Sequence, residues 1–171
     1  MIIFRDAVTS SKDELLSDSF NFKEVDGVVY EADCAMIEIG AVEVNTGANA
    51  SAEEADEGLE DTAQKVNNIV HSFRLQPTSF DKKSYGVHLK GYMKKVQEHL
   101  KAKGAPESEI EAFQKGANAF AKKVLGSFKD WEFYTGESMD VDGMVVLLNY
   151  REDGTTPYVV VWKHGLEEMK V

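Results

Sequence analysis

Hydrophobic and polar residues follow two different spacings along the chain, one typical of strands and one typical of helices. Short runs rich in β-branched and aromatic residues lie near both ends, and Asp26-Gly27 between two of them is a dipeptide favoured in two-residue hairpin turns. Between 69 and 75, one set of residues alternates with another, which favours a half-buried strand; the sets are Ile69, His71, Phe73 and Leu75, and Val70, Ser72 and Arg74. The sequence therefore predicts strands at 1–5, 20–25, 28–33, 35–44, 69–75, 130–134, 144–150 and 157–163.

The middle of the chain has the three- and four-residue spacing of amphipathic helices. Asp81 or Ser84 can cap a first helix, Gly104 can end it, and Pro106 suits the start of a second one. We therefore expect an α+β fold of antiparallel or mixed sheets, with a two-helix hairpin inserted at about 82–128. The apolar stripes expected to pack are Tyr85, Leu89, Tyr92, Met93, Val96 and Leu100, and then Ile110, Phe113, Ala117, Phe120, Val124 and Phe128.

Charge is distributed unevenly over the 171 residues, whose formal net charge is −11. Residues 24–64 contain twelve acids and neither Lys nor Arg, whereas residues 82–129 contain eleven lysines and four glutamates. The net acidity argues against a general affinity for nucleic acid. Residues 45–64 offer little to bury and carry a run of like charge, so they are predicted to form a long flexible acidic loop.

Few residues suggest catalysis or tight metal binding. The sequence has no phosphate-binding glycine loop, no catalytic-serine elbow and no zinc motif with paired histidines. Cys34 is the single cysteine, so no zinc site built on cysteine pairs is expected, and a buried structural thiol is favoured over a nucleophile. Asp140-Val-Asp142-Gly143 matches only part of a calcium loop, which favours an acidic turn.

These features together predict the general class of the protein. We expect a non-enzymatic, single-domain protein spanning 1–171, without a tightly bound cofactor. The charged residues Arg5 and Asp6 interrupt any signal-like apolar run at the N-terminus, and the other apolar runs are too short to cross a bilayer. A soluble intracellular protein with no transmembrane segment is therefore expected.

Two segments carry a specific resemblance. Residues 45–57, NTGANASAEEADE, and residues 133–150, FYTGESMDVDGMVVLLNY, are similar to the two signatures of the translationally controlled tumour protein family. The likeness extends to the Met-Ile-Ile opening and to residues 13–18, 30–36 and 150–157, and so covers essentially the whole chain. Val70-His-Ser-Phe-Arg-Leu75 and Gly126-Ser-Phe-Lys-Asp-Trp131 most resemble its fungal branch.

The resemblance implies a β-tent body, similar to small Rab-interacting exchange factors, with a projecting helical hairpin and a flexible acidic loop. Those exchange factors hold zinc with cysteine pairs, which this chain lacks because Cys34 stands alone. The family is described as cytoplasmic, cytoskeleton-associated, calcium-binding and active in growth and stress responses. The resemblance thus implies a monomer with tubulin and a Rheb-like small GTPase as binding partners. It also implies association with mitochondria under stress.

Three functions from different classes follow as hypotheses. The first is microtubule binding through the basic hairpin, since Lys83, Lys90, Lys94 and Lys101 fall within about 40° of one another on a helix. Its alternative is that these lysines only solvate the helix and offset the acidic loop. Tubulin surfaces are acidic, so the ridge is complementary to them.

The second hypothesis is regulation of a small GTPase through Glu14, which matches the family's proposed contact, and its neighbour Asp13. Its alternative is that both acids cap or solvate a turn. The third is a chaperone-like or calcium-linked stress protein, with weak calcium binding by Glu53, Glu54, Asp56 and Glu57. Charge placement discriminates the hypotheses, because tubulin binding depends on the hairpin lysines, nucleotide exchange on Glu14 and calcium binding on the loop acids.

Overall fold

The structure is a computed structural model that describes residues 1–39 and 64–170. Its largest sheet has six antiparallel strands in the order β3-β4-β10-β9-β8-β7, and its central strand β10 is buried along its whole length. The bounds are β3 Phe22–Val25, β4 Val29–Asp33, β7 Gln76–Thr78, β8 Glu132–Thr135, β9 Val146–Tyr150 and β10 Pro157–Trp162.

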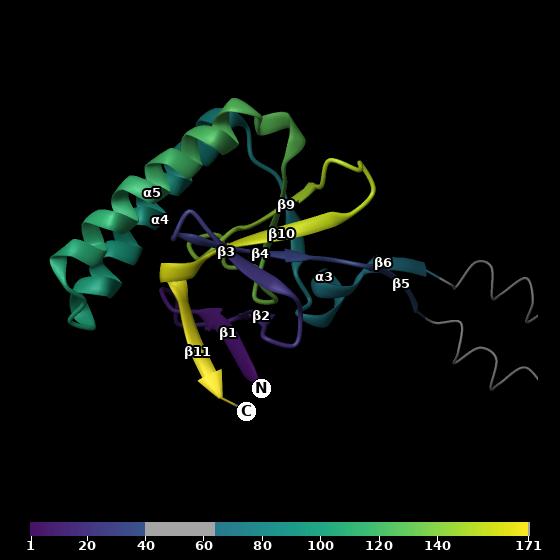
Figure 1. Ribbon diagram of the computed structural model, residues 1–171, viewed down its shortest axis with the longest axis horizontal. Helices are drawn as coiled ribbons and strands as arrows, with labels where there is room; N and C mark the ends of the chain where they lie inside the picture. Colours follow the sequence, from purple (N-terminus) through teal and green to yellow (C-terminus); the bar gives the residue numbers. More distant parts are fainter. Residues whose placement is uncertain (40–63, 171) are drawn as a thin grey trace, which may run out of the picture.

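The described part of the chain also forms two smaller antiparallel sheets. The first has the order β11-β1-β2, where β11 spans Leu166–Lys170, β1 spans Ile2–Asp6 and β2 spans Glu14–Ser17. Pairing of Ile2 with Lys170 brings the two ends of the chain side by side (Figure 1). The second sheet pairs β5, Met36–Ile39, with β6, Gln64–Asn67.

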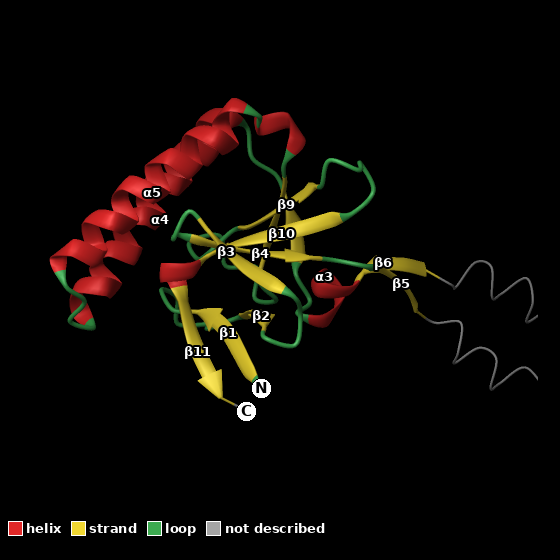
Figure 2. Ribbon diagram, in the orientation of Figure 1, coloured by secondary structure: helices red, strands yellow, loops and turns green. Residues whose placement is uncertain are grey.

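The helical hairpin consists of α4, Lys82–Ala102, and α5, Glu107–Gly126, which lie side by side along one flank of the sheets (Figure 2). The Asp81 carboxylate accepts from the Ser84 N–H at 2.7 Å, and the Ser84 hydroxyl accepts from the Asp81 N–H at 3.0 Å. This capping box fixes the start of α4, and Gly104 follows the helix with a φ of 79°. The predicted hairpin is confirmed.

The apolar stripes of the hairpin pack on each other and on the body. Tyr85, Leu89, Tyr92, Val96 and Leu100 of α4 are buried, as are Ile110, Phe113, Ala117, Phe120 and Val124 of α5. The Phe120 ring packs edge-on against Trp162 of β10, with ring centroids 5.5 Å apart. Of the two remaining predicted members, Met93 is half-buried and Phe128 lies in the short 3-10 helix η1, Phe128–Asp130.

The structure corrects one predicted strand. Residues 69–75 contain the short helix α3, Asn68–Ser72, because the Asn67 side chain accepts from the N–H groups of Ile69 and Val70 at 3.0 and 3.1 Å. This side-chain cap stabilises a helical turn over the alternating pattern. The structure also contains four strands that the sequence reading missed, namely β2, β6, β7 and β11.

The remaining predictions agree where the structure describes the residues. Asp26 and Gly27 both have positive φ, 56° and 71°, and the Val28 N–H donates to the Val25 carbonyl at 3.2 Å, as in the predicted turn. Val25 pairs with Val29, however, so the loop between β3 and β4 contains Val28 as a third residue. β5 occupies 36–39 of the predicted strand 35–44, and residues 40–44 lie outside the described part. The predicted acidic loop 45–64 also lies outside it, except for Gln64, which begins β6.

Candidate functional site

The four lysines predicted as a ridge all lie on α4. Lys83, Lys90, Lys94 and Lys101 are exposed, and none forms an ion pair with another residue of the described part of the chain. At about 100° per residue, the ridge lies on the opposite side of α4 from Tyr92, which packs toward the body. The helix can therefore present these lysines to a partner while it stays docked.

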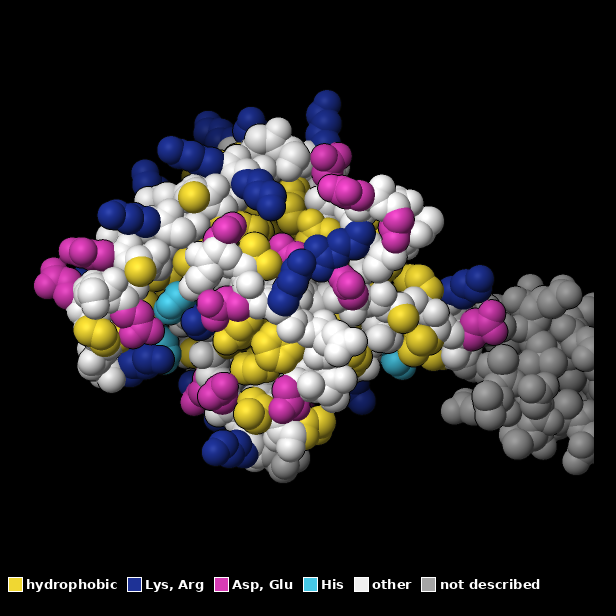
Figure 3. Space-filling model, viewed as in Figure 1, with side chains coloured by type: hydrophobic (Ala, Val, Ile, Leu, Met, Phe, Trp, Pro, Cys, Tyr) yellow, Lys and Arg dark blue, Asp and Glu magenta, His cyan; other side chains and the backbone are white. Residues whose placement is uncertain are grey.

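The ridge is part of a larger cationic region of the hairpin. Between Lys82 and Gln97 of α4, and between Ala112 and Gly126 of α5, the sequence contains lysines and no carboxylate. Figure 3 shows dark blue side chains along this part of the hairpin and magenta ones at its free tip. The lysines are Lys82, Lys83, Lys90, Lys94, Lys95, Lys115, Lys122 and Lys123, and the acids toward the tip are Glu98, Glu107, Glu109 and Glu111.

A groove of about 460 Å³ runs between the two helices beside the ridge. Its walls combine apolar side chains with Lys90 and Lys94, so the ridge forms one of its borders. The lining residues are Gly86, Leu89, Lys90, Met93, Lys94 and Gln97 from α4, and Asn118, Ala121 and Leu125 from α5. Sequence reasoning identified the two lysines and missed the groove, because a groove depends on how two helices face each other.

The two N-terminal acids have different surroundings. The Asp13 carboxylate accepts from the N–H and the hydroxyl of Ser138, at 3.2 and 2.5 Å. A Cβ on Gly136 would overlap the Asp13 carboxylate, so Asp13 also packs against the backbone of the 133–150 segment. Glu14 begins β2, is exposed, and forms no ion pair within the described residues. Asp13 is therefore held by hydrogen bonds, whereas Glu14 is exposed and could contact a partner.

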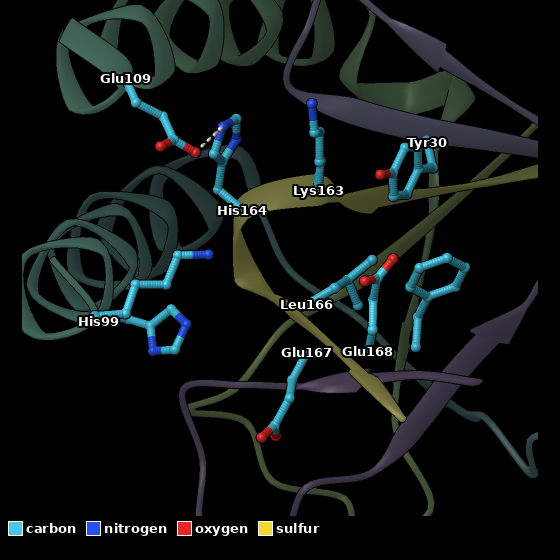
Figure 4. Close-up of a pocket in the computed structure, with 10 residues that line it drawn as sticks. Tyr30, His99, Glu109, Lys163, His164, Leu166, Glu167 and Glu168 are labelled. Carbon is cyan, nitrogen blue, oxygen red and sulfur yellow. Dashed lines mark ion pairs between the residues drawn. The ribbon is translucent and has the colours of Figure 1, made fainter. Parts of the chain in front are cut away.

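A second cleft, of about 530 Å³, lies between the body and the half of the hairpin near the turn that joins α4 to α5 (Figure 4). His164, in the short 3-10 helix η2 (Lys163–Gly165), points toward Glu109 of α5, with 3.9 Å between Nε2 and the carboxylate. The His164 side chain is 9% exposed, and burial lowers its pKa, as does the neighbouring Lys163 charge. Burial also lowers the pKa of His99, which lines the same cleft.

No group of three or more His, Cys, Asp or Glu side chains suited to a metal ion occurs among residues 1–39 and 64–170. The calcium candidates Glu53, Glu54, Asp56 and Glu57 lie outside these ranges. Asp140 accepts through Oδ1 from the N–H of Asp142 at 3.0 Å, as in an acidic turn. Cys34 is buried, and burial raises the pKa of its thiol to about 11, which disfavours the thiolate needed by a nucleophile.

The fold and its basic hairpin define a class of α+β proteins in which antiparallel sheets carry a projecting pair of helices. The sequence pattern of the family described as "Translationally controlled tumour protein" matches residues 1–167. The chain belongs to this family. None of the helices in the described part of the chain is both long and apolar enough to cross a lipid bilayer.

Relatives and solved structures agree over the full length. The chain is 68% identical to a translationally-controlled tumor protein homolog of Neurospora crassa and 64% identical to one of Candida albicans, each covering 100% of both chains. A solved structure from Schizosaccharomyces pombe, named translationally controlled tumor-associated protein, matches with a TM-score of 0.82 at 52% identity, with 100% of both chains covered. The Caenorhabditis elegans protein matches with a TM-score of 0.72 at 31% identity, covering 100% of this chain and 99% of that one.

Proposed function

We propose that the chain is a non-enzymatic, cytoplasmic binding protein that attaches to microtubules through the lysine ridge of α4. The observation that carries this proposal is the exposure of Lys83, Lys90, Lys94 and Lys101 on one side of a helix, with no carboxylate between Asp81 and Glu98 in the sequence. Exposed lysines without local partners keep their charge available for an acidic surface. The rest of the chain is acidic and would repel such a surface, so the attraction is confined to the hairpin.

Charge reversal on the ridge tests the proposal. We expect Lys90→Glu with Lys94→Glu to weaken microtubule co-sedimentation about tenfold or more at low salt, because two attractive charges become repulsive. The matched control is Lys23→Glu with Lys170→Glu, which makes the same charge change at exposed positions of β3 and β11. This control should co-sediment nearly as the parent does.

Salt dependence separates binding from simple solvation of the helix. The Debye length falls from ~10 Å at 0.1 M salt to ~3 Å at 1 M, so parent binding should weaken steeply over this range. Co-sedimentation of the ridge variant at the parent level, with both proteins folded by circular dichroism, would remove the ridge as the binding surface.

A second candidate function is regulation of a Rheb-like small GTPase through Glu14. It is supported by the exposure of Glu14 on β2, a strand at the edge of its sheet, while Asp13 is held by Ser138. A placed carboxylate can compete for the magnesium and phosphate contacts that hold a nucleotide. Weak calcium binding by the acids at 53–57 and a role in growth and stress responses are further proposals, supported by the family membership alone.

A further inference from the structure

We propose that the groove between α4 and α5 binds an acidic amphipathic helix of a partner protein. The proposal rests on the proposed function in taking the hairpin as a binding surface, and it adds an apolar contact to the charge of the ridge. Three observations support it: small residues leave the groove open, its charged lining residues are lysines, and its length suits a helix.

The groove is hollow because small residues lie where larger ones would fill it. Gly86 lines it from α4 and Ala121 lines it from α5. A Cβ built on Gly86 meets nothing within 4 Å, so this part of the groove is open space. Met93 and Leu125 are only half-buried and provide apolar surface that the hairpin does not fully cover, beside the buried Leu89. Exposed apolar surface of this kind between helices is where amphipathic partners bind.

Both charged side chains that line the groove are lysines. Lys90 and Lys94 line the α4 side, and Lys122 is exposed on α5 next to Ala121 in sequence. No carboxylate lines the groove, whereas three glutamates line the cleft of Figure 4. A partner helix with apolar residues on one face and acids beside that face would complement the apolar floor and the lysines together.

The length of the groove fits a short helix. Its α4 residues run from Gly86 to Gln97, which at 1.5 Å per residue is about 17 Å, or roughly three helical turns. A partner helix of that length presents apolar residues at i, i+3 or i+4, and i+7, the spacing used in helix-in-groove recognition. A disordered acidic segment with few apolar residues would contact the lysines and leave the apolar residues of the groove exposed.

The test separates the apolar contact from the charge. The probe is a fluorescent synthetic peptide of about four helical turns, with leucines along one face and glutamates elsewhere, measured by fluorescence anisotropy on the full chain. Gly86→Leu fills the groove and keeps every lysine. Gly91→Leu is the matched control, because Gly91 is exposed on the same helix, also has nothing within 4 Å of a built Cβ, and does not line the groove.

We expect the parent and Gly91→Leu to bind the peptide alike, and Gly86→Leu to bind it about tenfold more weakly or worse. A peptide of the same composition with its leucines spread around the helix should bind the parent weakly. Equal binding by Gly86→Leu and the parent, equal binding of the two peptides, or no binding by the parent would overturn the proposal. Vesicles containing anionic lipid that compete with the peptide at the groove would overturn it in favour of a membrane surface.

The same variants keep this proposal distinct from microtubule binding. If Lys90→Glu with Lys94→Glu abolishes co-sedimentation while Gly86→Leu leaves peptide binding unchanged, the ridge is a microtubule contact and the groove proposal fails. If Gly86→Leu abolishes peptide binding while reversal of the two lysines leaves co-sedimentation unchanged, the groove proposal stands and the microtubule proposal fails.

Discussion

At the scale of single residues, buried polar groups connect segments far apart in sequence. The Asp6 carboxylate is 4% exposed and accepts from the N–H groups of Val8 and Met144, at 3.1 and 2.8 Å. A Cβ on Gly143 would overlap this carboxylate, so glycine is needed for the approach. Burial raises the pKa of Asp6 although both hydrogen bonds favour its ionised form. Asp6 and Asp13 thus hold the 133–150 segment against the N-terminal sheet.

Tyr92 provides the opposite case, a buried hydroxyl with no hydrogen-bond partner among the described residues. Burial raises its pKa far above the usual value, because the phenolate would be desolvated. Since an unsatisfied buried hydroxyl is a cost of folding, we expect Tyr92→Phe to leave the free energy of unfolding unchanged or to raise it by about 1 kcal/mol. Urea denaturation followed by circular dichroism measures this directly.

The control for this prediction is removal of the whole ring. Tyr92→Ala should lower the free energy of unfolding by about 3–5 kcal/mol, because it leaves a cavity between α4 and the body. A loss above about 1 kcal/mol in Tyr92→Phe would instead show that the hydroxyl has a hydrogen-bond partner, such as an ordered water.

At the scale of elements, Gly116 fixes how closely α5 approaches the sheet. A Cβ built there lies 2.4 Å from Cγ1 of Val28, a stiff and fully buried side chain, and 3.4 Å from the carbonyl oxygen of Asp26. We expect Gly116→Ala to lower the free energy of unfolding by about 1–3 kcal/mol, since the clash outweighs the gain in helix propensity.

Gly86→Ala is the matched measurement for Gly116→Ala. Gly86 is also inside a helix, but nothing lies within 4 Å of its built Cβ, so only the propensity gain applies. It should raise the free energy of unfolding by about 0.5–1 kcal/mol. A stabilising Gly116→Ala would contradict the close packing of α5 on the turn between β3 and β4.

The elements that the sequence predicted correctly are those with local causes. The hairpin follows from apolar periodicity, from the capping box of Asp81 and Ser84, and from Gly104, all of which act within a few residues. The strands missed near the ends depend on distant partners, because β11 exists only by pairing with β1. The strand predicted at 69–75 was wrong for a local reason. The side chain of Asn67 caps a helical turn there, and the alternating pattern gives no sign of this cap.

The same distinction applies to the candidate site. The lysine ridge could be predicted because its four residues share one helix and need only the helical period. The groove could not, since it combines residues of two helices, although Gly86 inside a predicted amphipathic helix was a visible signal of missing side-chain volume. The contact between Asp13 and Ser138 spans 125 positions and had no sequence signal.

At the scale of the whole molecule, three histidines lie between the hairpin and the body. His88 stacks near Phe80 and Tyr92, with ring centroids 5.3 and 6.1 Å away. His99 lines the cleft of Figure 4, and His164 packs on Phe113 with centroids 5.0 Å apart. Docking of the hairpin therefore desolvates three side chains that can gain a proton near neutral pH.

Charges of both signs face these histidines and partly offset each other. Burial is therefore the largest cause of the pKa shift at each histidine. His88 lies near Lys95 and Asp142, whereas His99 lies near Lys12, Lys103 and Glu167. Lys163, Lys103, Glu109 and Glu24 act on His164. In all three cases the pKa is lowered from the ordinary value of 6.5, which means that the folded protein binds these protons less readily than the unfolded chain.

Stability should consequently fall as the pH falls below about 6.5. The contribution of each neutral histidine is fully present above the unfolded pKa of 6.5 and is lost as the pH falls through the lower folded pKa. We expect the free energy of unfolding, from urea denaturation, to decrease between pH 7.5 and 5.5, with a slope of at most about 1.4 kcal/mol per pH unit for each histidine. The shifted carboxyl groups of Asp81, Asp153 and Glu167 titrate below this window. The raised pKa of Asp6 acts in the opposite direction, because the folded protein binds that proton more readily than the unfolded chain does.

Single substitutions assign this slope to the hairpin interface. His164→Gln and His88→Gln should each flatten the pH dependence, because the side chain that gains a proton on unfolding is gone. His71→Gln is the control, since His71 is exposed on α3, away from the hairpin. If stability stayed constant or rose between pH 7.5 and 5.5, the histidines would be gaining their protons as readily in the folded protein as in the unfolded chain. Protonation of His164 would then be compensated by Glu109, whose carboxylate is 3.9 Å from Nε2, and the hairpin would stay docked as the pH falls.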